Sequence, residues 1–112
     1  MASATGCCQV TTTLPDRAAA ERLAAALVEE RRAACVQVAG PVASTYRWEG
    51  RIEQATEWYC HCKTTDAAAP GLQARIRELH PYDTPEIIAT PIVDGDPDYL
   101  RWIEASVRDR GS

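Results

Sequence analysis

An α+β domain is the fold class that the sequence predicts, and three observations predict it. Short β-branched segments alternate with amphipathic helical segments in the order β-α-β-β-α-β-α. A Glu49-Gly50 pair separates two long strand-like runs, which is typical of a tight hairpin. The 112 residues are 46% hydrophobic and 25% charged. This length and composition fit a single domain, 1–112, with a core over about residues 7–108.

The chain begins with a strand and a helix. Residues 7–13 are predicted to form the first strand, because they are β-branched toward their end and are followed by Leu-Pro-Asp. Asp16 is a suitable N-cap for a helix over residues 17–34. Arg31 and Arg32 then stand in its last turn, where the helix dipole favours positive charge.

A long hairpin follows. Residues 35–48 form one strand, which is interrupted by a bulge or bend at Gly40-Pro41. Residues 52–65 form the returning strand. The sequence therefore predicts two paired strands that are longer than average.

The remaining segments form two helices and a strand. A second helix is predicted to be capped by Asp66 and to end before Pro81. Its apolar stripe consists of Leu72, Ile76 and Leu79. Residues 86–93 are predicted to form the fourth strand. Asp96 then caps a last helix that runs to about residue 108, with Pro in its first turn.

The first six elements match the ferredoxin-like β-α-β-β-α-β arrangement, with one additional C-terminal helix. Two right-handed crossovers place both internal helices on one face of a four-stranded antiparallel sheet. The returning strand is aromatic or apolar on both faces, since Trp58, Cys60 and Cys62 point one way and Tyr59 and His61 the other. A sheet that is apolar on both sides needs cover on both sides, so we expect copies of the chain to assemble.

Composition excludes several classes of function. The net charge is −4, which argues against a protein that binds nucleic acid through the phosphate backbone. No window is long and apolar enough for a membrane span, and the first six residues do not resemble a secretory signal. The five cysteines are an odd number without a C-x-x-C motif, and we interpret them as reduced, buried side chains of a cytoplasmic protein.

His80 and Glu86 are the candidate metal ligands. They flank a two-proline loop that also carries Tyr82 and Asp83, and imidazole with carboxylate suits Cu or Zn. The alternative is that His80 caps the last carbonyls of its helix. The Cys60-His61-Cys62 run is a weaker metal candidate, because alternate residues of a strand point to opposite faces.

Several segments together resemble the CutA divalent-cation tolerance proteins. The most specific are Tyr46-Arg47-Trp48-Glu49-Gly50 and the run from Glu78 to Ile88, ELHPYDTPEII. Ala33-Ala34-Cys35, Lys63-Thr64 and Asp98-Tyr99-Leu100-x-Trp102-Ile103 add to the resemblance. It extends from about residue 7 to residue 107, nearly the whole chain.

The resemblance implies a ferredoxin-like subunit, a stable homotrimer, and a cytoplasmic role in tolerance of copper and other divalent cations. In some members of the family, copper is attributed to a first-strand cysteine and to consecutive histidines before the Pro-Tyr of the loop. Here Thr12 and Leu79 occupy two of those positions, and His80 is retained. The implied ligand is Cu(II) or another divalent cation, and no further cofactor is expected.

Two other functions stay open at this point. One is a trimeric sensor that resembles the PII-type signalling proteins and binds an anionic metabolite between subunits, in a cleft lined by Lys63, Tyr82 and Glu86. The other is a non-catalytic scaffold trimer. In the expected homotrimer, Tyr46, Trp48 and Trp58 are the candidate interface residues, because aromatic side chains are enriched in interfaces. No nucleotide-binding, metalloprotease or hydrolase motif is present, so we expect no enzyme activity and no catalytic residue.

Overall fold

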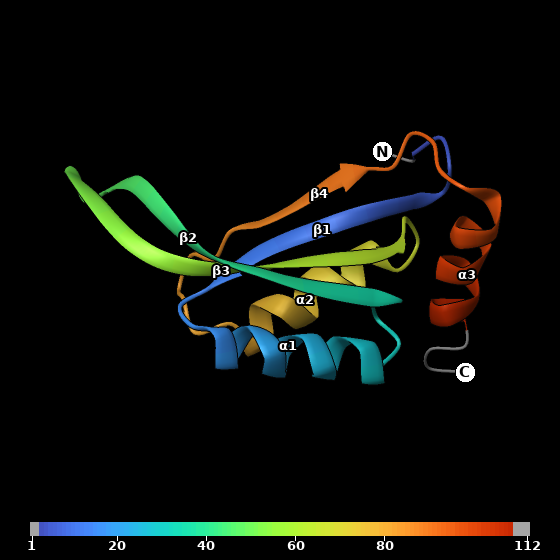
Figure 1. Cartoon of the computed structure of the whole chain (residues 1–112), viewed down its shortest axis with the longest axis horizontal. Coiled ribbons are helices and arrows are strands. Elements are labelled where there is room, and N and C mark those ends of the chain that lie inside the picture. Colours follow the sequence, from blue (N-terminus) through green and yellow to red (C-terminus); the bar gives the residue numbers. More distant parts are fainter. Residues whose placement is uncertain (1–2, 109–112) are drawn as a thin grey trace.

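The computed structural model describes residues 3–108 and contains seven elements in the predicted order (Figure 1). The elements are β1 (Cys7–Leu14), α1 (Arg17–Glu29), β2 (Cys35–Trp48), β3 (Arg51–Thr65), α2 (Ala69–Leu79), β4 (Ile87–Pro91) and α3 (Pro97–Arg108). Within residues 3–108, no helix combines the length and apolar character that crossing a bilayer requires.

The four strands form one antiparallel sheet in the order β2-β3-β1-β4. Figure 1 shows α1 and α2 on the same side of this sheet, and α3 at the end where β1 begins. The predicted ferredoxin-like topology with an additional C-terminal helix is therefore confirmed.

The β2–β3 hairpin extends beyond the sheet as a two-stranded arm, residues 42–57, which projects away from α3 in Figure 1. The strand pairing shifts at Gly40-Pro41, as predicted. A Cβ on Gly40 would lie 2.8 Å from ring atoms of Trp58, so the bend requires glycine there. Glu49 and Gly50 have φ of 50° and 77°, which confirms the two-residue turn.

Helix α1 ends at Glu29 and not at residue 34 as predicted. Arg31 has φ of 57°, and its N–H donates to Val28 O at 3.0 Å. The Arg32 N–H donates to Leu27 O at 3.0 Å, and this pair of bonds closes a Schellman motif. An arginine occupies the left-handed position that glycine usually holds, so the sequence carried no stop signal. The two arginines consequently do not lie in the last helical turn.

The start of α2 also differs from the prediction. Asp66 does not cap the helix, because its carboxylate accepts bonds from Ser3 N at 2.6 Å and Ser3 Oγ at 2.9 Å. Thr65 Oγ1 instead accepts from Ala68 N at 3.1 Å. At the other end of the helix, Leu79 is exposed, so it does not extend the buried stripe of α2.

The main core lies between the sheet and helices α1 and α2. Its largest fully buried apolar side chains are Val10, Leu14, Leu27, Cys60, Cys62, Leu72 and Ile76. A second, smaller cluster forms where α3 packs Ile103 and Val107 against Cys7 and Ala34. The predicted cap of α3 is confirmed, since Asp96 Oδ2 accepts from Tyr99 N at 3.1 Å.

Candidate functional site

The face of the sheet opposite α1 and α2, the open face, is mostly polar. Strand pairing and alternation place these side chains on it: Gln9, Thr11, Thr13, Cys35, Gln37, Ala39, Tyr59, His61, Lys63, Ile88 and Thr90. The prediction of a sheet that is apolar on both faces is wrong here, because among these residues only Tyr59 and Ile88 are large and apolar. Three consecutive threonines in β1 concealed the alternation, since Thr12 points inward between Val10 and Leu14 while its neighbours point outward.

His61 lies near the centre of the open face. Its Nδ1 is 3.4 Å from Gln9 Nε2 and 3.4 Å from Thr11 Oγ1, and its ring stacks on Tyr59 with centroids 5.0 Å apart. An amide nitrogen can only donate, so Nδ1 accepts and the ring proton resides on Nε2. Burial, and secondarily the charge of Lys63, lowers the pKa of His61, while Glu86 acts in the opposite direction. The imidazole is therefore neutral near pH 7.

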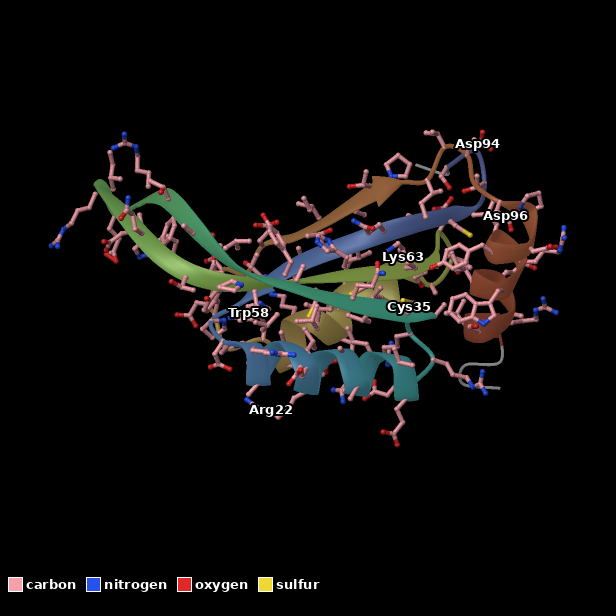
Figure 2. All side chains as sticks on the ribbon, viewed as in Figure 1. Arg22, Cys35, Trp58, Lys63, Asp94 and Asp96 are labelled. Carbon is pink, nitrogen blue, oxygen red and sulfur yellow. The ribbon has the colours of Figure 1, made fainter. Side chains whose placement is uncertain are left out.

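Lys63 occupies the end of the open face nearest α3. Its Nζ donates to Gln37 Oε1 at 2.8 Å, and no carboxylate oxygen of residues 3–108 lies within 4.0 Å of it. In Figure 2, Lys63 lies over the strands of the sheet, below β1 in the view, whereas Trp58 lies nearer α1. The partner of Lys63 is thus a neutral amide, and no acidic group of residues 3–108 compensates its charge.

His80 lies outside the open face, at the end of α2. Its Nε2 is 2.8 Å from Thr13 O, and the Tyr82 N–H donates to its Nδ1 at 3.1 Å. A carbonyl can only accept, so His80 carries its proton on Nε2 and both ring nitrogens have backbone partners. Burial lowers the pKa of His80, opposed by the bond to Thr13. The His80 ring therefore links the loop after α2 to β1. It does not cap the last carbonyls of α2, so the capping alternative is wrong.

A buried carboxylate that the sequence analysis missed lies beside this loop. Glu57, on β3 at the root of the arm, is 9% exposed, and its Oε2 accepts from Tyr82 OH at 3.0 Å. Burial, followed by this hydrogen bond, raises the pKa of Tyr82 to about 12. Nothing in the local pattern distinguished Glu57 from the exposed charges of the hairpin, because its burial depends on a loop about 25 residues later in the chain.

The predicted site residues are only partly brought together. Tyr82 binds Glu57 at the root of the arm, whereas Lys63 lies on β3 six positions further along, so the three cleft residues do not line one pocket in the single chain. The ring nitrogens of His80 face Thr13 and Tyr82 rather than Glu86. Within residues 3–108, no group of three or more His, Cys, Asp or Glu side chains is arranged to hold a metal ion.

The cysteines of β3 are buried structural side chains, as predicted. Cys60 Sγ donates to Ala20 O at 3.4 Å, and burial raises the pKa of Cys60 to about 11 and that of Cys62 to about 12. His61 points to the other face, which agrees with the strand-geometry argument against a shared metal.

The aromatic residues proposed for an interface divide into two groups. Tyr46 and Trp48 are on the arm, with 44% and 49% of their surface exposed, together with Ile52 at 67%. Trp58 differs, because it packs against the main core with the Arg17 guanidinium 5.7 Å from its ring centroid. Of the three aromatic residues, only Tyr46 and Trp48 therefore present exposed apolar surface to a partner.

Comparison with known proteins identifies relatives over almost the whole chain. The family model described as CutA1 divalent ion tolerance protein matches residues 8–106. The divalent-cation tolerance protein CutA of Pectobacterium atrosepticum is 44% identical over 96 residues, which cover 86% of this chain and 87% of that protein.

Solved structures agree with the sequence relatives. CutA from Xylella fastidiosa superposes with a TM-score of 0.89 at 38% identity, covering 91% of this chain and 98% of that one. The Archaeoglobus fulgidus protein, described as a periplasmic divalent cation tolerance protein CutA, gives a TM-score of 0.87 at 37% identity, with coverages of 90% and 98%.

Proposed function

The chain belongs to the CutA1 family of divalent ion tolerance proteins, and we propose that it acts in the cellular response to divalent cations, copper among them, as a non-catalytic cytoplasmic homotrimer. The observation that carries this proposal is the family match over residues 8–106, which spans the whole fold except the first residue of β1 and the last two residues of α3. Deleting the gene in its native host should lower the copper concentration that stops growth, and reintroduced wild-type protein should restore it. Unchanged tolerance of copper, zinc and cobalt in the deletion strain would refute the role.

The arm supports assembly. It carries Tyr46, Trp48 and Ile52 as exposed large apolar side chains, in a hairpin that extends beyond the sheet and both helices that cover it. Aromatic groups presented in this way are enriched in protein interfaces. Sedimentation at micromolar concentration should give a trimer for wild type. Trp48→Glu should dissociate it, whereas Val28→Glu, at a similarly exposed apolar position on α1, should not.

The proposed compartment is supported by cysteine chemistry. All five cysteines are free, four of them are buried, and such thiols persist in a reducing compartment. The Archaeoglobus relative is described as periplasmic, so the assignment needs its own experiment. Fractionation of native cells should place the chain with a cytosolic marker, and recovery with periplasmic proteins would refute this part of the proposal.

The proposed cation contact uses His80 and Glu86. His80 can ligate only by giving up its bond to Thr13 O or the bond from Tyr82 N, so we expect weak binding. Calorimetric titration with Cu(II) and Zn(II) tests this on wild type, on His80→Gln and on Glu86→Gln.

His61→Gln is the matched control, because the chain has only two histidines. Loss of heat in both proposed-ligand variants but not in the control would support the contact. Equal heats for all four proteins would exclude both residues.

A further inference from the structure

Lys63 is the only lysine in the sequence; the other eleven basic residues are arginines. It is half-buried on the open face, and its one polar side-chain contact within residues 3–108 is Gln37. In the isolated chain, water can still solvate the ammonium group. If a second copy covers the open face, that water is removed, and an ammonium without a counter-charge is then costly to bury.

Glu86 lies at the opposite corner of the same face. It directly precedes β4, where Ile87 pairs with Thr12 and packs toward the core, and its charge acts on His61. It is exposed, and no basic side chain of residues 3–108 pairs with it.

The two charges cannot meet within one chain. Lys63 pairs with Gln9, whereas Glu86 directly precedes Ile87, the partner of Thr12, and is therefore level with Thr13, four residues further along β1. This offset is about 13 Å along the strands, and two strand spacings add about 10 Å across the sheet. The open face therefore has a positive corner and a negative corner, each without a partner of its own.

We propose that in the metal-free assembly the Lys63 ammonium of each copy pairs with the Glu86 carboxylate of a neighbouring copy. This inference rests on the proposed trimer, in which each open face offers its positive corner to one neighbour and its negative corner to the other. Glu57 is the other carboxylate near that corner, but it is nearly buried and already accepts the hydroxyl of Tyr82. Glu86 is the acidic group that remains free to supply the counter-charge.

Charge reversal tests the pair. Lys63→Glu and Glu86→Lys, each alone, should raise the concentration at which the assembly dissociates by about a hundredfold or more. The double variant, with the charges exchanged, should return to within about tenfold of wild type. Glu29→Lys, an exposed reversal on α1, is the control that should change nothing. EDTA in all samples separates this contact from any cation bound at Glu86.

A second measurement applies if a charge-reversal variant does not fold. Because Lys63 is the only lysine, an amine-selective acetylating reagent can modify the side chain of one residue, and the α-amino group serves as an internal standard. Lys63 should be protected in wild type, and the mild variant Glu86→Gln should increase its labelling relative to the standard.

The outcomes are distinguishable. A monomeric wild type would overturn the proposed assembly together with this inference. A trimer that survives both single reversals, or a double variant that stays dissociated, would overturn the pairing and leave the assembly in place. If Glu86→Gln leaves Lys63 protected while added inorganic phosphate slows its labelling, a small anion is the partner and the pairing is wrong.

Discussion

Replacing Thr12 by Val should make the protein more stable. Thr12 is 0% exposed, and its Oγ1 is the one buried side-chain N or O atom of the described residues that has no hydrogen-bond partner. Valine has nearly the same shape, so the change removes an unpaired hydroxyl without opening a cavity. A buried polar group left unsatisfied costs about 1–3 kcal/mol. We therefore expect the free energy of unfolding to rise by about 1–2 kcal/mol.

Thr64 supplies the matched control. It is also 0% exposed in a strand, but its Oγ1 donates to Arg32 O at 2.9 Å. Thr64→Val loses that bond and leaves the carbonyl unpaired, so the free energy of unfolding should fall by about 1 kcal/mol. The two variants make the same chemical change and should move stability in opposite directions, with a difference of about 2–3 kcal/mol.

Urea unfolding followed by tryptophan fluorescence measures both changes. Because assembly would couple unfolding to dissociation, all proteins are compared at one concentration and their urea m-values are required to agree. Thr12→Val should raise the midpoint and Thr64→Val should lower it. The reasoning fails if Thr12→Val is less stable than wild type with an unchanged m-value, since that result would mean that the hydroxyl contributes a favourable interaction.

Three further predictions concern the turn after α1, the hydrogen bond between His80 and Thr13, and the thiols. Arg31→Gly should raise the free energy of unfolding by about 0.5–1 kcal/mol in the same urea assay, because φ of 57° strains an arginine and not a glycine; a drop in stability would show that its bond to Ser106 O matters more. The pKa of His80 is lowered on folding, so the unfolded chain binds more protons in the window just below pH 6.5 and stability should decrease as pH falls through it. His80→Gln should show a smaller decrease there, and an identical pH profile would contradict the assignment. In the dissociated Trp48→Glu variant, a maleimide should modify the half-exposed Cys35 while Cys62, whose pKa burial raises to about 12, stays unmodified; mass spectrometry of peptides would reveal the reverse order if the burial is wrong.

Sequence patterns were sufficient for the order of the elements and for the hairpin. These features depend on local rules: Asp96 caps α3, Glu49-Gly50 allows positive φ, and Gly40-Pro41 interrupts the pairing. The family resemblance rested on motifs that are contiguous in the chain, and the comparisons agree with it.

The candidate site was less predictable, because its contacts join distant segments. His80 was predicted as a metal ligand from its place in a loop, yet its partner Thr13 O is 67 residues away. Glu57 was overlooked because its partner Tyr82 is 25 residues away. Sequence spacing identifies which side chains can do chemistry, but it does not show which of their atoms are already bonded to the backbone.

The sequence by itself determined the β-α-β-β-α-β-α order and the long hairpin, because both follow from periodicity and turn chemistry within a few residues. Only the tertiary structure decided where α1 ends, what Asp66 binds, and that the open face is mostly polar with Lys63 and Glu86 at opposite corners. The physical reason is that these features depend on contacts between distant segments: the Arg31 side chain donates to Ser106 O, Ser3 donates to the Asp66 carboxylate, and Thr12 is buried in the core.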